Sequence, residues 1–487
     1  MDYLDPKKNQ RNILMLKIGY LLIAISIGVM VLILNYLSNG YNYNNGEITQ
    51  QGMIYLASQP SPANIYINNK LNSAQTNARI FLNSGSYNFT IKKTNYRSWS
   101  HEITIPGGMV VNYLYPFLFP NVIPQKKIFS YASAPTQASE SPSQQYVITT
   151  NPSNFNSFYL YDLNSGTITP KLLTLPSGLI SPAQTSQSWK FIAWANDNTH
   201  LLVEHIYDGN TEFMELDTSN ISSSININQT FSITPTTVSL NNLDYNSFYF
   251  YNSATQTLST ANLSNINLVN VASSVLAYKS YLTSIFLYVS SVSKTSSEAS
   301  VYLNDAGTNY FLQNINLAPT YLLNMANYNG NDYVVVGGSN NKYLDIYENP
   351  QLLAQSSTKA IVPFRILDIP NASYESFAPT AQFIVAENGQ NVIVYDIKHD
   401  NVDNYNLAYP LTSGESSVHW MDGDRLYYIG NNLIQVFDFD NTNQQTLTSA
   451  LPGYRLFFNN GYTDYYSISL NPKTNHIDFM QNSLIAK

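Results

Sequence analysis

The chain has 487 residues, of which 44% are hydrophobic and only 11% charged, with a formal net charge of −8 and no cysteine. A charged share below half of the roughly 25% usual in soluble globular chains argues against coiled coils and charge-rich disorder. The lack of cysteine excludes disulfides, cysteine-ligated zinc, iron–sulfur clusters and cysteine nucleophiles. The negative charge, with no basic run beyond the first residues, argues against a nucleic-acid partner.

The first predicted element is a membrane span over Ile18–Leu37, which reads IGYLLIAISIGVMVLILNYL and carries no charge. Its length is what a helix needs to cross about 30 Å of hydrocarbon. The basic residues before it are Lys7, Lys8, Arg11 and Lys17, whereas the next one after it is Lys70. The positive-inside rule therefore predicts a cytoplasmic tail over residues 1–17, with all that follows residue 38 outside the cell membrane.

A cleavable signal peptide is the alternative interpretation, because it also combines a basic start with an apolar run. The run is long for a signal peptide, and NYLSNGYNYNNG after it offers no A-x-A cleavage site. We therefore favour an uncleaved anchor, and the sequence does not decide between the two.

Residues 38–51, rich in Asn, Tyr and Gly, are predicted to be a linker, and residues 52–120 a small β domain. In this domain apolar and polar residues alternate in short runs that Gly, Pro and Asn separate. Such alternation with period two is typical of short antiparallel strands.

The small domain resembles the PEGA domain, a β module of microbial cell surfaces, through Pro62-Ala63, Gly85-x-Tyr87 and an aromatic at Tyr96. Asn69 and Asn95 stand where glycine is common in that family, and we expect both to adopt positive φ, which Asn tolerates. The resemblance implies a non-catalytic envelope module. Trp99 and Tyr96 are expected to pack in its core rather than to stack on a ligand.

Residues 121–143 are rich in Pro, Ser, Ala and Gln and are predicted to be a connector. In residues 144–487 a hydrophobic strand followed by a polar turn then recurs about every 44 residues, within the about 40–50 residues of a four-stranded propeller blade. The occurrences end near Asp162, Asp217, Asn252, Asn304, Tyr347, Asp396, Asp438 and Asn471.

The segments FIAWANDNTHLLV and VHWMDGDRLYY within residues 144–487 are similar to the strand and turn units of WD40-like and TolB-like propellers. The predicted fold is therefore mainly β: an N-terminal transmembrane helix, a small antiparallel β domain and a β-propeller of seven or eight blades. A pair of β-sandwiches or a solenoid is the alternative.

Candidate sites for chemistry are few. The histidines are His101, His200, His205, His399, His419 and His476, and none has a metal-ligand spacing. We expect His200 and His205 to face opposite sides of one strand.

Ser291 to Lys294 fits S-x-x-K without its partner motifs. Asp438, Asp440 and Asn443 resemble a partial calcium loop, and Asp422-Gly423-Asp424 a solvated turn. We therefore predict no catalytic, metal or cofactor-binding residue.

The function expected from these features is non-enzymatic binding by a membrane-anchored envelope protein, whose propeller holds another surface protein or an envelope glycan. The alternative is an extracytoplasmic hydrolase or lyase that acts on carbohydrate or peptide in the propeller funnel. That enzyme would need converging carboxylates, for which the candidates are Asp197, Glu204, Glu387, Asp422 and Asp424. A subunit of a surface assembly is a third possibility.

Overall fold

The computed structural model describes residues 6–38, 40–44, 47–293, 295–356, 361–415, 417–471 and 474–486, with side chains for all of these except residues 6–10, 42–48 and 356. The chain divides into two compact units. Unit 1 comprises Met1–Val122 with Ala486–Lys487, and unit 2 comprises Ile123–Ile485.

The N-terminal helix, α1, runs over Pro6–Ser38 and contains the whole predicted span. A window of 18 residues within Arg11–Ser38 has a mean hydropathy of 2.4, and none of it is buried. Among the described residues, α1 is the one helix that is long and apolar enough to cross a membrane. A helix that is apolar all round needs an apolar surrounding. Both an anchor and a signal sequence meet this description. The side chains of Lys7 and Lys8 lie outside the described residues.

Unit 1 contains two four-stranded sheets. In the first, β2 (Glu47–Leu56) pairs with β1 (Tyr41–Asn44) and β5 (Ala78–Asn83), and β8 (Val110–Tyr113) joins it in parallel. The second has the order β4 (Lys70–Gln75), β3 (Asn64–Ile67), β6 (Gly85–Lys92) and β7 (Trp99–Ile105). The predicted linker over residues 38–51 is thus partly strand, because Tyr and Ile among its polar residues favour extended backbone.

One hydrophobic cluster joins the two sheets of unit 1. It includes Ile54 of β2, Ile65 of β3, Phe89 of β6 and Trp99 of β7, all at most 1% exposed. The predicted core position of Trp99 is therefore confirmed, and Tyr96 packs against the same cluster. Asn69 and Asn95 have φ of 64° and 68°, so the expected positive φ is also confirmed.

The described part of unit 2 consists of eight four-stranded antiparallel sheets. The first four are β10–β13 (Ala138–Glu140, Tyr146–Thr150, Ser157–Asp162, Lys171–Thr174), β14–β17 (Gln187–Trp194, His200–Tyr207, Asn210–Asp217, Ile225–Asn226), β18–β21 (Thr237–Asn241, Asp244–Asn252, Thr257–Asn262, Asn265–Ala272) and β22–β25 (Val275–Ser280, Ile285–Ser290, Glu298–Asp305, Thr308–Asn316). The short helices are η1 (Ile221–Ser223), α2 (Ile227–Phe231) and α3 (Pro350–Ser356).

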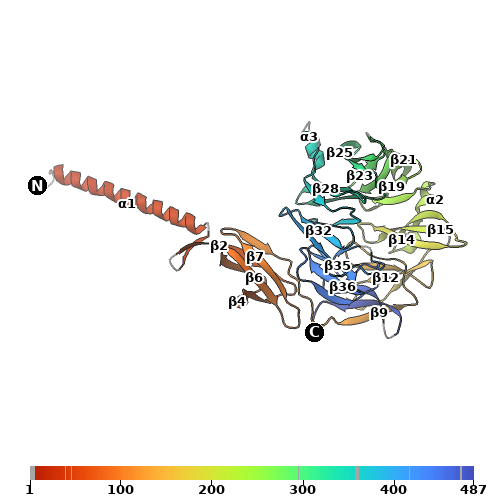
Figure 1. The fold of residues 1–487 in the computed structure, drawn as a ribbon, viewed down its shortest axis with the longest axis horizontal. Helices are drawn as coiled ribbons and strands as arrows, with labels where there is room; N and C mark the ends of the chain where they lie inside the picture. Colours follow the sequence, from red (N-terminus) through yellow and green to blue (C-terminus); the bar gives the residue numbers. More distant parts are fainter. Residues whose placement is uncertain are drawn as a thin grey trace. The chain divides into compact units, whose positions relative to one another are not determined.

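The last four sheets continue the pattern. They are β26–β29 (Tyr321–Tyr328, Asn331–Gly338, Tyr343–Glu348, Arg365–Asp368), β30–β33 (Tyr374–Phe377, Phe383–Glu387, Asn391–Asp396, Asn401–Asn406), β34–β37 (His419–Trp420, Arg425–Gly430, Leu433–Asp438, Gln445–Ser449) and β38–β40 with β9 (Phe457–Phe458, Asp464–Leu470, Ile477–Ser483; Gln125–Tyr131). Figure 1 shows the sheets following one another around a ring, from orange β12 through green to blue β36.

Hydrophobic clusters between neighbouring sheets hold the ring together. One cluster joins Phe158 of the first sheet to Val203 of the second, and another joins Phe479 of the last sheet to Tyr161 of the first. The centroids of the aromatic rings of Phe479 and Tyr161 lie 4.4 Å apart. The arrangement is that of a β-propeller, as predicted, because each sheet buries both faces only against its neighbours.

The last sheet corrects the predicted connector. Strand β9 pairs with β40 and thereby completes this sheet with residues from the start of unit 2, and β10 opens the first sheet. Residues 121–143 therefore supply two strands, and unit 2 begins at Ile123 rather than at residue 144. The local sequence could not show this, because Ser130 of β9 and its partner Asp478 are 348 residues apart.

The recurring motif has two structural positions. Six of its occurrences lie at or near the end of the third strand of a sheet, as Asp162 does at the end of β12. Asn252 ends β19 and Asn471 follows β39, both of which are second strands. This difference accounts for part of the uneven spacing in the sequence.

Candidate functional site

The five candidate carboxylates belong to three different sheets. Asp197 and Glu204 lie on the sheet β14–β17, Glu387 ends β31, and Asp422 and Asp424 share the turn between β34 and β35. Glu204 and Glu387 have separate local partners: Glu204 Oε2 lies 3.3 Å from Lys190 Nζ, and Glu387 Oε2 accepts a hydrogen bond from the backbone of Val418. The five residues therefore do not form one acid–base site.

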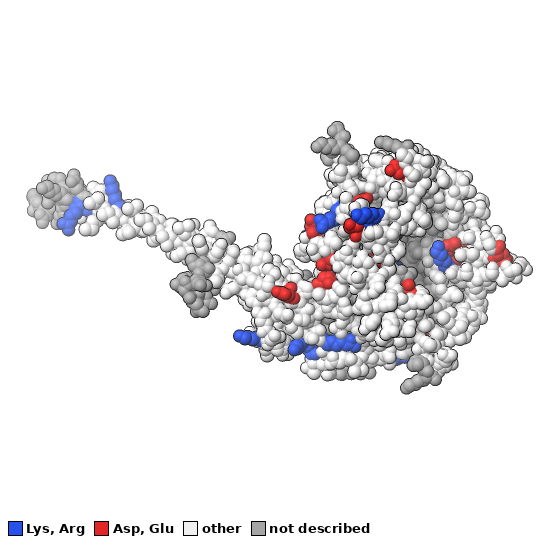
Figure 2. Space-filling view, in the orientation of Figure 1, with Lys and Arg blue, Asp and Glu red and all other residues white. Residues whose placement is uncertain are grey.

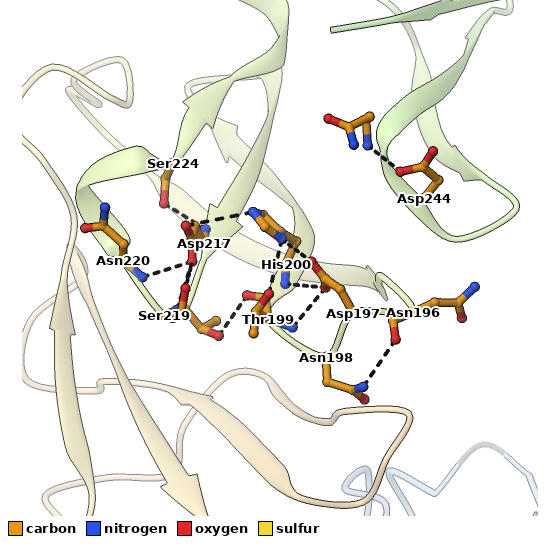
Figure 3. Close-up of polar contacts among 12 residues, drawn as sticks. Asn196, Asp197, Asn198, Thr199, His200, Asp217, Ser219, Asn220, Ser224 and Asp244 are labelled. Atoms are coloured by element: carbon orange, nitrogen blue, oxygen red, sulfur yellow. Dashed lines mark hydrogen bonds and ion pairs between the residues drawn. The ribbon is translucent and has the colours of Figure 1, made fainter.

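Asp197 organises the turn between β14 and β15 (Figure 3). Its Oδ1 accepts hydrogen bonds from the backbone N–H groups of Thr199 and His200, both at 3.0 Å, and its Oδ2 lies 2.5 Å from His200 Nδ1. The other ring nitrogen, Nε2, lies 3.9 Å from Asp217 Oδ2, and the ring stacks on Tyr245 at 4.0 Å. Burial raises the pKa of Asp197, but these hydrogen bonds outweigh burial and keep it below its usual value.

The same arrangement recurs in two other turns. Asp396 Oδ1 accepts from the backbone of Lys398 and His399, and its Oδ2 lies 2.6 Å from His399 Nδ1. Asp422 likewise caps two backbone N–H groups and binds the side chain of Arg425. Three turns with one geometry indicate that these aspartates cap loops, as Asp does in turns generally, rather than catalyse a reaction.

His205 lies apart from His200. Its Nδ1 is 2.9 Å from Glu212 Oε1, and its ring packs on Trp189 at 5.0 Å. Because Trp189 faces the first sheet and Tyr245, which holds His200, belongs to the third, the two histidines lie on opposite sides of their sheet, as predicted. Among the described residues, no group of three or more His, Asp or Glu side chains could hold a metal ion.

The partial calcium motif is also internally bonded. Asn443 Nδ2 donates to Asp438 Oδ2 at 2.9 Å, and the backbone and hydroxyl of Thr442 donate to Asp440 Oδ1. These carboxylates thus accept protein hydrogen bonds, as in a solvated turn. Of the S-x-x-K motif, Ser291 donates to Gln256 Oε1, and Lys294 lies outside the described residues.

The first strands of the first six sheets contact one another in succession, and we call these strands the inner wall: β10, β14, β18, β22, β26 and β30. Three of them, β14, β18 and β22, border a cavity of about 630 Å³. Its charged groups are Lys190, Glu204 and Lys279, and Ser239, Ser280 and Tyr281 add hydroxyls among apolar side chains. Figure 2 shows how sparse charged residues are on the visible face, so two lysines in one cavity are a local concentration.

Glu375 lies further round the inner wall, on β30. Asn324 of β26 donates to its Oε2 at 3.2 Å, and Lys279 is close enough to act on it electrostatically. Burial raises the pKa of Glu375 to about 7, although the hydrogen bond and the lysine charge oppose this rise. The inner wall thus combines cations with a carboxyl group that is partly protonated near neutral pH.

Glu215 of β16 is the most strongly perturbed carboxyl group near the His200 turn. It is 3% exposed, and neither carboxyl oxygen has a hydrogen-bond partner among the described residues. Burial, with the negative charges of Asp197, Asp244 and Asp217, raises its pKa to about 9. Glu215 is therefore a neutral acid at pH 7.

Comparison with known proteins identifies part of unit 1. Residues 51–117 match the family model of the PEGA domain. The resemblance expected from the sequence is thereby confirmed. We call residues 51–117 the PEGA segment, which covers most of the two sheets and the core of unit 1. No curated protein sequence is similar to the chain.

Solved structures similar to the chain include the Dos1 propeller, with 13% identity, a TM-score of 0.45 and coverage of 74% of this chain and 96% of that one. An oligogalacturonate lyase in complex with manganese has 9% identity and a TM-score of 0.37, and the match covers 75% of this chain and 98% of the lyase chain. A structure from an analysis of two prolyl endopeptidases has 10% identity and a TM-score of 0.43, and the match covers 73% of this chain and 54% of that one.

The sequence analysis missed the residues that the structure makes most notable. Lys279 is the one charged residue of β22, whereas Glu215 shares β16 with Glu212 and Asp217. Glu375 is the one charged residue of β30. That is the one available signal, because a charged residue within a buried strand usually has a specific environment. The pattern alone does not show that Lys279 and Glu375 meet on one inner wall.

Proposed function

We propose that α1 is an uncleaved membrane anchor, with residues 1–17 in the cytoplasm and units 1 and 2 outside the cell membrane. The proposal rests on the apolar, unburied stretch Arg11–Ser38 and on the basic residues that precede the apolar segment. In this arrangement unit 2 is a non-enzymatic platform for another surface protein or an envelope glycan.

The cavity bordered by β14, β18 and β22 carries this proposal. Its volume of about 630 Å³ lies within the range of about 300–1,000 Å³ typical of ligand sites. Apolar walls with a few polar groups are the usual lining of such sites. The exposed Lys279 side chain has no acidic partner within 4.0 Å among the described residues, and it is therefore available to a ligand.

The roles of the acidic residues favour binding over hydrolysis. Asp197 and Asp422 cap turns, Glu204 pairs with Lys190, and Glu375 accepts from Asn324. A hydrolase that uses two carboxyl groups needs them on either side of one bond, about 5–9.5 Å apart in glycosidases. The cavity itself is lined by a single acidic residue, Glu204.

The test is a crosslinked pull-down of the full, membrane-bound chain from its own cells, with two charge-reversal variants. Lys279→Glu changes the cavity, whereas the matched control Lys342→Glu changes an exposed lysine that lies 3.7 Å from Asp368 and lines no part of the cavity. We expect the wild type and the control to retain one discrete partner. Lys279→Glu should recover about tenfold less of this partner, which corresponds to a loss of roughly 1.4 kcal/mol in binding free energy.

Equal recovery by all three forms would remove the cavity from the proposal. Conversion of the recovered partner to smaller products by the purified chain would support the hydrolase or lyase alternative. Residence of the mature chain in the soluble fraction, with α1 cut off, would support the signal-peptide interpretation.

A further inference from the structure

Unit 1 exposes a row of apolar side chains on one face of its first sheet. Met53 of β2 lies opposite Phe81 of β5 and opposite Val110 of β8. Phe81 is 65% exposed and Val110 57% exposed, whereas Ile54 and Ile80, which point to the other face, are in the core. Side chains on one face of a sheet alternate with those on the other, so the row is a continuous apolar strip.

This strip, Phe81, Met53 and Val110, lies directly beside the end of α1. Gly40, two residues beyond the helix, accepts a hydrogen bond from Gln51 N at 2.7 Å, and Gly108 N donates to Gln51 O at 2.9 Å. A Cβ placed on Gly40 would lie 3.6 Å from the Cα of Gly108. The chain that leaves α1 therefore touches the turn that leads into β8.

The helix end and the strip share one depression. Leu37 of α1, Phe81, Val110 and the 61% exposed Met109 line the same hollow of about 480 Å³. Ser38 and Gln51 are the polar members of this lining, and the apolar side chains of α1 and of the sheet meet around them. Contiguous exposed apolar patches on a soluble surface usually mark an interaction site.

The next row along the same face changes character. Tyr55 lies opposite Arg79 and Asn112, and Arg79 is exposed. Tyrosine and arginine are the residues that favour the headgroup level of a membrane, where an aromatic ring and a cation meet lipid phosphates. Away from the helix end, the rows on this face are therefore Gln51 with Asn83, then the apolar strip, then Tyr55 with Arg79.

We propose that the strip formed by Phe81, Met53 and Val110, with Met109, contacts the lipid bilayer in which α1 is anchored. This inference rests on the proposed anchoring function. The occupant is the bilayer because the strip adjoins the end of the one described helix that could cross a membrane. Unit 1 would then lie on the membrane surface rather than extend away from it on a free tether.

The chain has no cysteine, so a single introduced cysteine reports one position. The probe is Val110→Cys in the full chain, labelled with an environment-sensitive fluorophore and reconstituted into phosphatidylcholine and phosphatidylglycerol vesicles that contain a headgroup-level spin-labelled lipid. The matched control is Leu71→Cys, which is 62% exposed but lies on β4 of the other sheet. We expect at least about threefold stronger quenching at position 110 than at position 71, because the quencher acts only on nearby probes.

Each outcome separates the two proposals. If the chain does not float with the vesicles, anchoring by α1 fails and the contact fails with it. If the chain floats and positions 71 and 110 are quenched equally, the anchor stands and the contact is wrong. A change at position 110 that grows with the protein-to-lipid ratio without quenching would assign the strip to a second copy of the chain, and would also overturn the contact.

Discussion

Unit 1 and unit 2 are both built from four-stranded sheets, but they bury their apolar residues in different ways. In unit 1 one cluster lies between two sheets whose strands are close in sequence. In unit 2 the clusters lie between successive sheets, and one of them joins the last sheet to the first. Unit 1, with one core between two sheets, therefore exposes an apolar strip on the outer face of its first sheet. Unit 2, as a ring of sheets, has its cavity on the inner wall instead.

This difference suggests a division of roles. A closed ring hides strand edges, which is useful for a chain with only 11% charged residues because charged edges are a common defence against aggregation. Its inner wall then borders the cavity that contains Lys190, Glu204 and Lys279. The small unit contributes an outer surface instead, beside the end of α1.

The largest expected effects would test whether the two units unfold separately. Phe89 in unit 1 and Phe479 in unit 2 are both 0% exposed. Replacement of either by Ala should destabilise its own unit by about 3–5 kcal/mol, through lost burial and the cavity that remains. Hydrogen exchange followed by mass spectrometry in rising urea resolves the units. If either variant lowers the urea concentration at which both units lose protection from exchange, the two units do not unfold independently.

Within unit 2, a substitution in a buried copy of the aspartate-capped turn should lower stability much more than one in an exposed copy. Arg425, 7% exposed, binds Asp422 and lies 3.9 Å from Asp438, whereas the His399 side chain beside Asp396 is 61% exposed. Arg425→Met should lower the free energy of unfolding by about 3 kcal/mol, because it removes the cation beside the buried carboxylates of Asp422 and Asp438. His399→Ala should cost less than about 1 kcal/mol. Urea midpoints measure both, and similar costs would show that burial does not set the value of this turn.

The stability of unit 2 should depend on pH through Glu215. Its folded-state pKa of about 9 exceeds the ordinary value of 4.5, so the folded chain keeps a proton that the unfolded chain releases. The contribution of Glu215 is therefore complete below about pH 4.5 and is lost as the pH rises towards 9.

Glu215→Gln removes this titration. Between pH 5 and pH 8 we expect the free energy of unfolding to fall by about 2 kcal/mol more in the wild type than in the variant, since relaxation of the site reduces the full effect of burial. Urea unfolding at a series of pH values measures the difference. Parallel pH profiles would show that Glu215 is ionised in the folded chain.

The smallest expected effect tests a local turn of unit 1. Asn69 is exposed and has φ of 64°. Asn69→Ala should lower the stability of unit 1 by about 1 kcal/mol, because side chains with a Cβ disfavour this conformation. Asn69→Gly should match or slightly exceed the wild type. Thermal unfolding of unit 1 distinguishes them, and a stabilising alanine would contradict the role assigned to the turn.

Features that depend on nearby residues were predictable from the sequence. The positive φ of Asn69 follows from a turn of few residues, and the core position of Trp99 follows from alternation along one strand. The mainly β class followed from the recurring strands and turns. Strands β1 and β9 were not predicted, because polar or proline-rich surroundings concealed them.

The cavity bordered by β14, β18 and β22 was not predictable, because its groups meet only after the sheets pack around the ring. Lys190 and Lys279 lie on first strands of different sheets, and Glu375 reaches the same wall from a third. Of the five carboxylates that the sequence analysis selected, Glu204 lines the cavity. Asp197 and Asp422 were selected because their positions before polar turns are visible locally. Such positions favour capping residues, and that is how the structure uses them.

The pairing of β9 with β40 can form only late in the synthesis of the chain. Strand β9 is synthesised long before its partner, since 348 residues separate Ser130 from Asp478. At about 5–20 residues per second, β9 waits on the order of 20–70 seconds for that partner. Throughout this interval the edge that β9 will pair with does not yet exist, and a nascent chain that ends before residue 477 cannot complete this sheet.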